Sequence, residues 1–129
     1  MVIQIDLVHR DQALSDPGRL YAAEPSRAAQ SAADLLSIIV LEPDGALVPV
    51  AYGFSRDFLI CNIRQQRFAD AWPIYAELGY PRFLRLCRDS LAVVATPGGP
   101  ELFNWHDLIV QQSLHCSERG SIKEDTAVA

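Results

Sequence analysis

Lysine, cysteine and long apolar runs are all scarce in this chain of 129 residues. Lys123 is the only lysine among eleven basic residues, and because arginine codons are rich in G and C, this bias indicates a GC-rich, bacterial genome. The longest apolar run, residues 35–41, includes Ser37 and is far shorter than the ~20 residues that span a membrane. The chain does not open on a basic segment followed by a long apolar run, so we expect no secretory signal and no membrane partner. These features favour a cytoplasmic protein.

The three cysteines, Cys61, Cys87 and Cys116, are far apart and odd in number. A secreted disulfide framework usually has an even set in a shorter chain, so we expect reduced thiols. The spacings typical of zinc sites, paired CxxC motifs or HExxH, are absent. His106 and His115 are nine residues apart, which on one helix places their imidazoles on opposite faces. We therefore predict neither a bound metal nor a cofactor.

The charge balance is acidic, with a formal net charge of −5 and a pI near 5.0. Phosphate backbones repel such a chain, so we expect no nucleic-acid partner. Half of the residues are apolar and 21% are charged, which is typical of a globular domain and excludes a disordered chain. The length suits a single core, which we predict to occupy residues 1–116. Residues 117–129 are polar, and we expect a flexible tail.

A β-hairpin is predicted between residues 37 and 52. Residues 37–41 and 46–52 are rich in β-branched side chains and are separated by Glu42-Pro43-Asp44-Gly45. In such a turn proline presets φ and glycine supplies a positive φ. Pro49 cannot donate to a ladder, so we expect it to face outward, at an edge or a bulge.

Helices are predicted both before and after the hairpin. Residues 81–95 carry a buried stripe made of Phe83, Leu86, Cys87, Leu91 and Val94, with Arg82, Arg85 and Asp89 pointing outward. Pro73 removes a hydrogen bond and clashes with the preceding turn, so we expect a kink or a break there, with Gly79 closing the segment. Residues 9–23 have no clear period and are predicted to be loop. The predicted helices are residues 26–36, 64–78, 81–95 and 100–116.

The order of these elements predicts an α+β fold, in which three or four helices pack mainly on one face of a small antiparallel sheet. The sheet is expected to have three or four strands, the hairpin included. The predicted strands are residues 2–8, 37–41, 46–52 and, from a segment that also fits a helix start, 58–63.

Assembly into a homodimer is predicted from the central strands. Their apolar residues occupy both odd and even positions, which point to opposite faces of the sheet, so the pattern indicates burial on both faces. If the helices cover only one face, about 500 Å² of apolar surface stays in water, at about 25 cal/mol per Å². We predict a two-fold dimer with Ile38, Val40, Val48 or Val50 at or near the interface.

Arg82 and Arg85 share one helical face and are candidate contacts for an anion or an acidic partner. Guanidinium groups suit this role because their donors match carboxylate and phosphate. The alternative is a solvated face on which the arginines pair with Asp89, Asp70 or Glu77.

Trp72, Trp105 and His106 are candidate cavity-lining residues, because aromatic side chains dominate the walls of ligand sites. Burial in the core is the alternative for both tryptophans. A nucleophilic pair could also form from His106 and either Cys61 or Cys87, if the fold brings them together.

Three functions remain open on these grounds. The first is a non-catalytic, acidic protein-interaction module that acts as an adaptor, inhibitor or regulator. The second is a small-molecule-binding domain or small enzyme with an aromatic-lined cavity between sheet and helices. The third is a thiol-dependent enzyme that uses the Cys–His pair. Fold class does not choose among them, because one scaffold hosts many functions.

Overall fold

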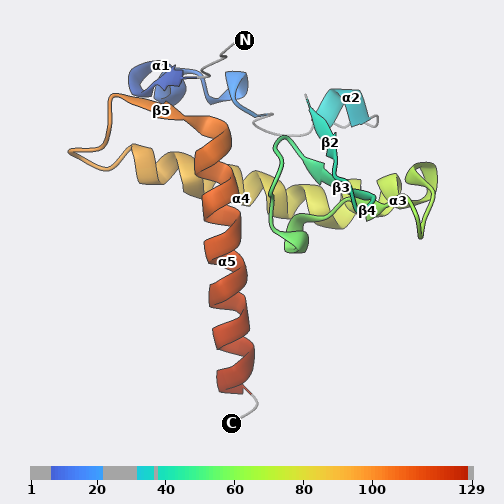
Figure 1. Cartoon of the computed structure of the whole chain (residues 1–129). Helices are drawn as coiled ribbons and strands as arrows, with labels where there is room; N and C mark the ends of the chain where they lie inside the picture. The colour runs from blue at the N-terminus through green and yellow to red at the C-terminus, as the bar shows by residue number, and fades with distance from the viewer. Residues whose placement is uncertain (1–6, 22–31, 37, 128–129) are drawn as a thin grey trace.

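The computed structural model describes residues 7–21, 32–36 and 38–127 (Figure 1). These residues form the predicted α+β fold, with small antiparallel sheets and helices packed against them. One sheet has two strands in the order β1-β5, and the other has three in the order β2-β3-β4. The strands are β1 (Leu7–His9), β2 (Ile39–Leu41), β3 (Ala46–Pro49), β4 (Cys61–Asn62) and β5 (Leu102–Asn104).

Five α-helices and three shorter helical turns complete the described elements. The helices are α1 (Arg10–Ser15), α2 (Ala32–Leu35), α3 (Phe68–Ile74), α4 (Tyr80–Val94) and α5 (Trp105–Ala127). The 3-10 turns are η1 (Pro17–Arg19) and η2 (Arg56–Phe58), and η3 (Tyr75–Gly79) is π-helical. The predicted strand and helix residues 2–6 and 26–31 lie outside the described residues.

The predicted hairpin is confirmed as β2 and β3, which pair with Val40 opposite Val48. The Gly45 N–H donates to the Glu42 carbonyl at 2.9 Å, and the Glu42 N–H donates to the Ala46 carbonyl at 2.8 Å. Gly45 has a φ of +89°, which is the left-handed conformation that closes a three-residue hairpin loop. The Pro-Asp-Gly signal therefore fixed the turn through local chemistry alone.

Pro49 is buried, and the expectation that it faces outward is wrong. It lies opposite Ile39, at a position whose main-chain nitrogen points away from β2, because the neighbouring Val50 N–H donates to Ile38 at 2.9 Å. On its other side β4 has already ended, since β4 pairs only with Ala46 and Leu47. Neither ladder therefore needs an N–H at position 49, and the proline costs the sheet no hydrogen bond.

Both faces of β3 are covered within a single chain. Val48 is 0% exposed and Pro49 is less than 2% exposed, although adjacent strand residues point to opposite faces. Val50 is also buried, at 9% exposure. The expected uncovered face of the sheet is therefore filled by the chain itself, and Val48 and Val50 are not available to a partner. Ile38, at 44% exposure, is still accessible.

The strand β3 ends in a strained turn. Val50 has a φ of +64°, and the Ala51 N–H donates across it to the Pro49 carbonyl at 2.7 Å. A β-branched side chain clashes with its own backbone in this conformation, at a cost of about 1–3 kcal/mol. Burial of the Val50 side chain in the core holds the turn in place.

The N-terminal strand pairs with β5 and not, as predicted, with the hairpin. Val8 lies opposite Phe103, and the Arg10 N–H donates to the Glu101 carbonyl at 2.7 Å. The segment expected to be loop contains helix α1, which begins where the His9 Nδ1 accepts the Asp11 N–H. Histidine is not a common N-cap residue, so the sequence carried no strong start signal.

A kink or a break was predicted at Pro73, and the chain passes through this residue without a break in the helix. Helix α3 continues into the π-helical turn η3, and η3 continues into α4, with Gly79 inside the run at φ −82°. The wider π turn lets the Tyr80 N–H reach the Tyr75 carbonyl, five residues back. The predicted buried stripe of α4 is confirmed, and Arg82, Arg85 and Asp89 are exposed as expected.

Helix α5 begins at Trp105, later than the predicted Pro100, because Leu102–Asn104 form a strand first. Its first turns pack on the body through Trp105, Ile109 and Ser113, which are spaced four residues apart and buried. The Ser113 Oγ accepts the Ser55 N–H at 3.1 Å. The helix continues to Ala127, and its C-terminal half extends beyond the other elements (Figure 1). The flexibility of residues 117–129 stays a prediction.

Candidate functional site

A groove of about 340 Å³ lies between the segment around η2 and the continuous run α3–η3–α4. We refer to it as the η2–α4 groove. Most of its lining side chains are apolar, and four carry polar or charged groups, namely Asp57, Gln66, Arg82 and the phenol of Tyr75. The lining residues are Asp57, Leu59, Ile60, Gln66, Ala71, Ile74, Tyr75, Leu78, Gly79 and Arg82.

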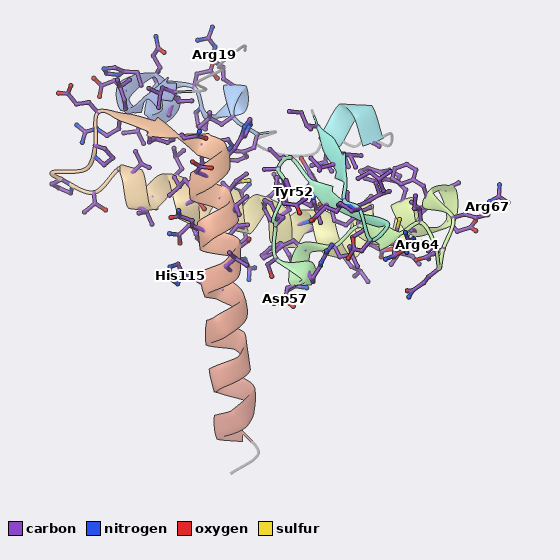
Figure 2. The ribbon with its side chains drawn as sticks, viewed as in Figure 1. Arg19, Tyr52, Asp57, Arg64, Arg67 and His115 are labelled. Carbon is purple, nitrogen blue, oxygen red and sulfur yellow. The ribbon has the colours of Figure 1, made fainter. Side chains whose placement is uncertain are left out.

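Stacked aromatic rings hold the two walls of the groove in register. Phe54 contacts Phe58 edge-to-face, with ring centroids 5.6 Å apart, and contacts Phe83 of α4 at 6.0 Å. Phe83 in turn lies 6.2 Å from Tyr80. All four rings are buried, so the position of η2 relative to α4 is set by core packing. Figure 2 shows Asp57 on η2 at the surface of this wall.

Arg82 brings a positive charge to the groove, which the acidic Asp57 also lines. Its Cζ lies 5.6 Å from the centroid of the Phe58 ring, a cation–π contact. Both Arg82 and Arg85 are exposed, as on the solvated face of the alternative, but within the described residues neither has a carboxylate at ion-pairing distance, so pairs with Asp89, Asp70 or Glu77 are not found there. Arg85 is exposed on the same helix but does not line the groove.

Two large apolar side chains form an exposed rim beside this charge. Ile74 is 57% exposed and Leu78 is 65% exposed. Ile74, Leu78 and Arg82 are four residues apart in a continuous helical run, so they follow one another along its surface. The sequence did not reveal this stripe, because Gly79 was expected to end the helix between Leu78 and Arg82.

Buried phenol groups lie beneath the groove. Tyr75 lines it, is only 4% exposed, and its hydroxyl has no hydrogen-bond partner among the described residues. The hydroxyl of Tyr80 is likewise buried and unpartnered. Burial, with the nearby Cys87, raises the pKa of Tyr75 far above its usual range and raises the pKa of Tyr80 to about 12. Both phenols therefore stay protonated at neutral pH.

Replacing Tyr80 with phenylalanine should raise the free energy of unfolding by about 1 kcal/mol, because an unpartnered buried hydroxyl costs about 1–3 kcal/mol in lost hydration. Urea unfolding followed by fluorescence gives this value. Tyr52→Phe is the control, since Tyr52 is 68% exposed and should leave stability unchanged. A clear loss of stability in Tyr80→Phe would contradict the prediction by showing that the hydroxyl is bonded in solution.

The predicted cavity-lining residues lie elsewhere. Trp72 is buried between Phe68 and Tyr75, at centroid distances of 5.7 and 5.4 Å. Trp105 is buried and stacks on Tyr21 at 5.8 Å, while the neighbouring His106 is half-buried at the start of α5. None of these three candidates lines the η2–α4 groove, so the structure does not bring them together with Arg82.

Two further hollows are found in the described part of the chain. One, of about 230 Å³, lies beside α1 and η1, and the other, of about 360 Å³, surrounds the hairpin turn. The second is bordered by Glu42, which is buried and lies 3.5 Å from Arg56. Arg56 also contacts Asp44 at 2.8 Å, while Arg64, which borders the same hollow, donates to the Pro43 carbonyl at 3.4 Å.

The three cysteines are free thiols, with Cys61 and Cys87 buried and Cys116 exposed. Burial raises the pKa of the Cys87 thiol far above its usual range and also raises the pKa of Cys61. A raised pKa disfavours the thiolate, which is the nucleophilic form. This environment lends no support to a nucleophilic role for either buried cysteine.

The described residues contain no group of three or more side chains placed to hold a metal ion. Among these residues, no helix combines the length and apolar character that crossing a bilayer requires. His106 and His115 both lie on α5, and in Figure 2 His115 points away from η2 and Asp57.

Comparison with known proteins finds no relative. The chain matches no model of a protein family, no curated protein and no solved structure. The function must therefore be argued from the geometry of the groove and the chemistry of its lining.

Proposed function

We propose that this chain is a non-catalytic protein-interaction module of the cytoplasm, acting as a homodimer, that binds an acidic amphipathic helix of a partner protein in the η2–α4 groove. The observation that carries the proposal is the Arg82 guanidinium, which has no ion pair within the described residues and follows the exposed Ile74 and Leu78. An apolar stripe that ends in a cation is complementary to an apolar stripe that ends in a carboxylate.

The spacing of the stripe suits a helical partner. Residues that are four apart in a helix advance about 6 Å along its axis, so Ile74 to Arg82 spans roughly 12 Å. A partner helix with apolar side chains on two successive turns and a glutamate on the next would meet all three residues at once. The π turn favours this surface, since such turns widen a helix and frequently mark functional sites.

The net charge of −5 weakens but does not prevent binding of an acidic segment. At physiological ionic strength charges are screened over about 8 Å, so the local field of Arg82 outweighs acidic groups on distant surfaces, and Asp57 is the one carboxyl among the lining residues. Two exposed apolar residues and one charge make a small interface. We therefore expect a weak, transient complex that weakens further with salt.

A second candidate function is the binding of a small anionic amphiphile. The volume of the groove, about 340 Å³, falls at the lower end of the range of ligand pockets, and an apolar floor with few polar groups is typical of them. The exposed rim favours the peptide, because Ile74 and Leu78 lie where a compact ligand would leave them in water.

Titration of the ¹⁵N-labelled protein with a synthetic acidic helix tests the proposal. The probe is an 18-residue peptide with leucines on two successive turns and glutamate on the next, and its match has lysine for each glutamate. We expect amide shifts at Leu78, Gly79 and Arg82 with the acidic peptide only. Arg82→Gln should weaken binding about tenfold, the effect of losing one charge-assisted contact of ~1.4 kcal/mol.

Arg19→Gln is the matched control, because Arg19 is exposed, lies on η1 and pairs with Asp16 at 3.7 Å. It should bind the acidic peptide with unchanged affinity. Equal binding by Arg82→Gln and the unmodified protein, or shifts confined to other surfaces, would refute the groove as the binding site. Shifts at the same amides with dodecanoate but not with the peptide would favour the second candidate.

A further inference from the structure

The strand β2 presents an unpaired edge. It is the outer strand of the three-stranded sheet, and Val40 lies opposite Val48 in its ladder with β3. The Glu42 N–H and the Ile38 carbonyl point toward β3, since they bond Ala46 and Val50. Ladder groups alternate along an antiparallel strand, so the N–H and carbonyl groups of Ile39 and Leu41 point away from β3. No hydrogen bond to them is found in the described part of the chain.

Apart from its length of only three residues, this edge lacks the features that usually prevent strand pairing. Exposed edges are normally protected by charged side chains, proline or bulges. The segment from Ile38 to Leu41 has only apolar side chains, with Ile38 44% exposed and Leu41 56% exposed. The other sheet edges carry polar side chains within their strands, His9 in β1, Asn62 in β4 and Asn104 in β5.

We infer that β2 pairs with β2 of a second copy of this chain, in antiparallel orientation, with the two-fold axis at Val40. The inference rests on the homodimer included in the proposed function and identifies its interface. This edge-to-edge dimer replaces the dimer predicted from the sequence, in which the sheet faces of two copies would meet, because the chain itself covers both faces of β3. The edge fits a second copy because an antiparallel strand pair related by a two-fold axis is self-complementary.

The parity of the ladder restricts the register. Within β2 only Ile39 and Leu41 have outward main-chain groups, and the register that pairs both of them in each copy places Ile39 opposite the partner's Leu41 and Leu41 opposite the partner's Ile39. This register forms four N–H to carbonyl bonds around the axis and joins two three-stranded sheets into one of six strands. Pairing cannot extend past the turn, because Pro43 has no N–H to donate. Each exposed Leu41 side chain then packs beside an Ile39 side chain of the other copy.

Ile39→Pro is the sharpest test of this interface. The Ile39 N–H is not used within the chain, since Ile39 and Pro49 form a pair without ladder bonds, so proline breaks no hydrogen bond of the protomer and costs it only the partial packing of the Ile39 side chain. In the dimer the substitution removes two of the four bonds, and we expect about tenfold weaker self-association. Leu41→Lys should act in the same direction, by placing a charge on the edge. Leu102→Lys is the control, with equal hydrophobic loss at a site 53% exposed in β5.

Sedimentation velocity of the full chain between about 1 and 200 µM, with hydrogen exchange, gives the readouts. We expect twice the protomer mass of 14.3 kDa at high concentration, with slow exchange of the Ile39 and Leu41 amides that is lost on dilution. A monomer at every concentration would overturn both this interface and the homodimer. A dimer that persists in Ile39→Pro, with both amides exchanging freely, would overturn the β2 interface alone. Neither result affects the peptide titration, which reports on the groove.

Discussion

Replacing Phe54 with alanine should lower the free energy of unfolding by about 3–5 kcal/mol, the usual range for removing a buried aromatic ring. Phe54 is 3% exposed and contacts both Phe58 and Phe83, so its ring joins the η2 wall of the groove to α4. The alanine leaves a cavity between these elements that the rigid neighbouring rings cannot fill. Chemical denaturation followed by circular dichroism measures the loss.

Tyr52→Ala is the control for this prediction. Tyr52 is two residues away, is also aromatic and is 68% exposed, so its removal should change stability by less than about 0.5 kcal/mol. Binding of the acidic peptide should weaken in Phe54→Ala even where the protein is still folded, since Arg82 is positioned over Phe58. Equal stabilities of the two variants would show that the aromatic cluster does not hold the groove.

Gly79→Ala should destabilise the protein by about 1–3 kcal/mol, although alanine in a helix is usually more favourable than glycine by about 1 kcal/mol. Gly79 has a helical φ, so backbone freedom is not the reason. A Cβ at this position would clash with Cδ2 of the Tyr75 ring, which is buried and cannot move aside without disturbing Trp72. The clash reverses the sign of the usual helix preference.

Gly18→Ala provides the comparison, because its added Cβ would meet only the Asp16 side chain, at an ordinary 3.4 Å. Thermal unfolding of both variants should show a lowered midpoint for Gly79→Ala and an unchanged or raised one for Gly18→Ala. If Gly79→Ala is as stable as the unmodified chain, the contact between Gly79 and Tyr75 is looser than described, and the π turn does not depend on glycine.

The homodimer was predicted from a correct pattern in the sequence, but with a wrong conclusion about which surface stays uncovered. Apolar residues at both parities of β3 do indicate burial on both faces, and both faces are buried. The error lay in assuming that the helices of one chain could cover only one of them. What stays exposed is the edge of β2 with Ile38 and Leu41, so the interface we infer is formed by main-chain groups and not by the face.

The candidate site was predicted only in part. Arg82 was identified from its spacing on the outer face of α4, and the fold places it at the groove. Trp72 and Trp105 were indistinguishable in the sequence from ligand-lining aromatics, and both pack into the core. Ile74 and Leu78 were not linked to Arg82, because Gly79 was expected to end the helix between them, whereas here the chain stays helical from α3 through η3 into α4.

The sequence by itself determined the hairpin, the buried stripe of α4 and the α+β class. Each depends on interactions among residues a few positions apart, where turn chemistry and side-chain periodicity act directly. The tertiary structure alone decided that β1 pairs with β5, that both faces of β3 are covered, and that Arg82, Ile74 and the η2 wall enclose one groove. These features join segments far apart in the chain, and their contacts form only when the whole core packs, so no local pattern could specify them.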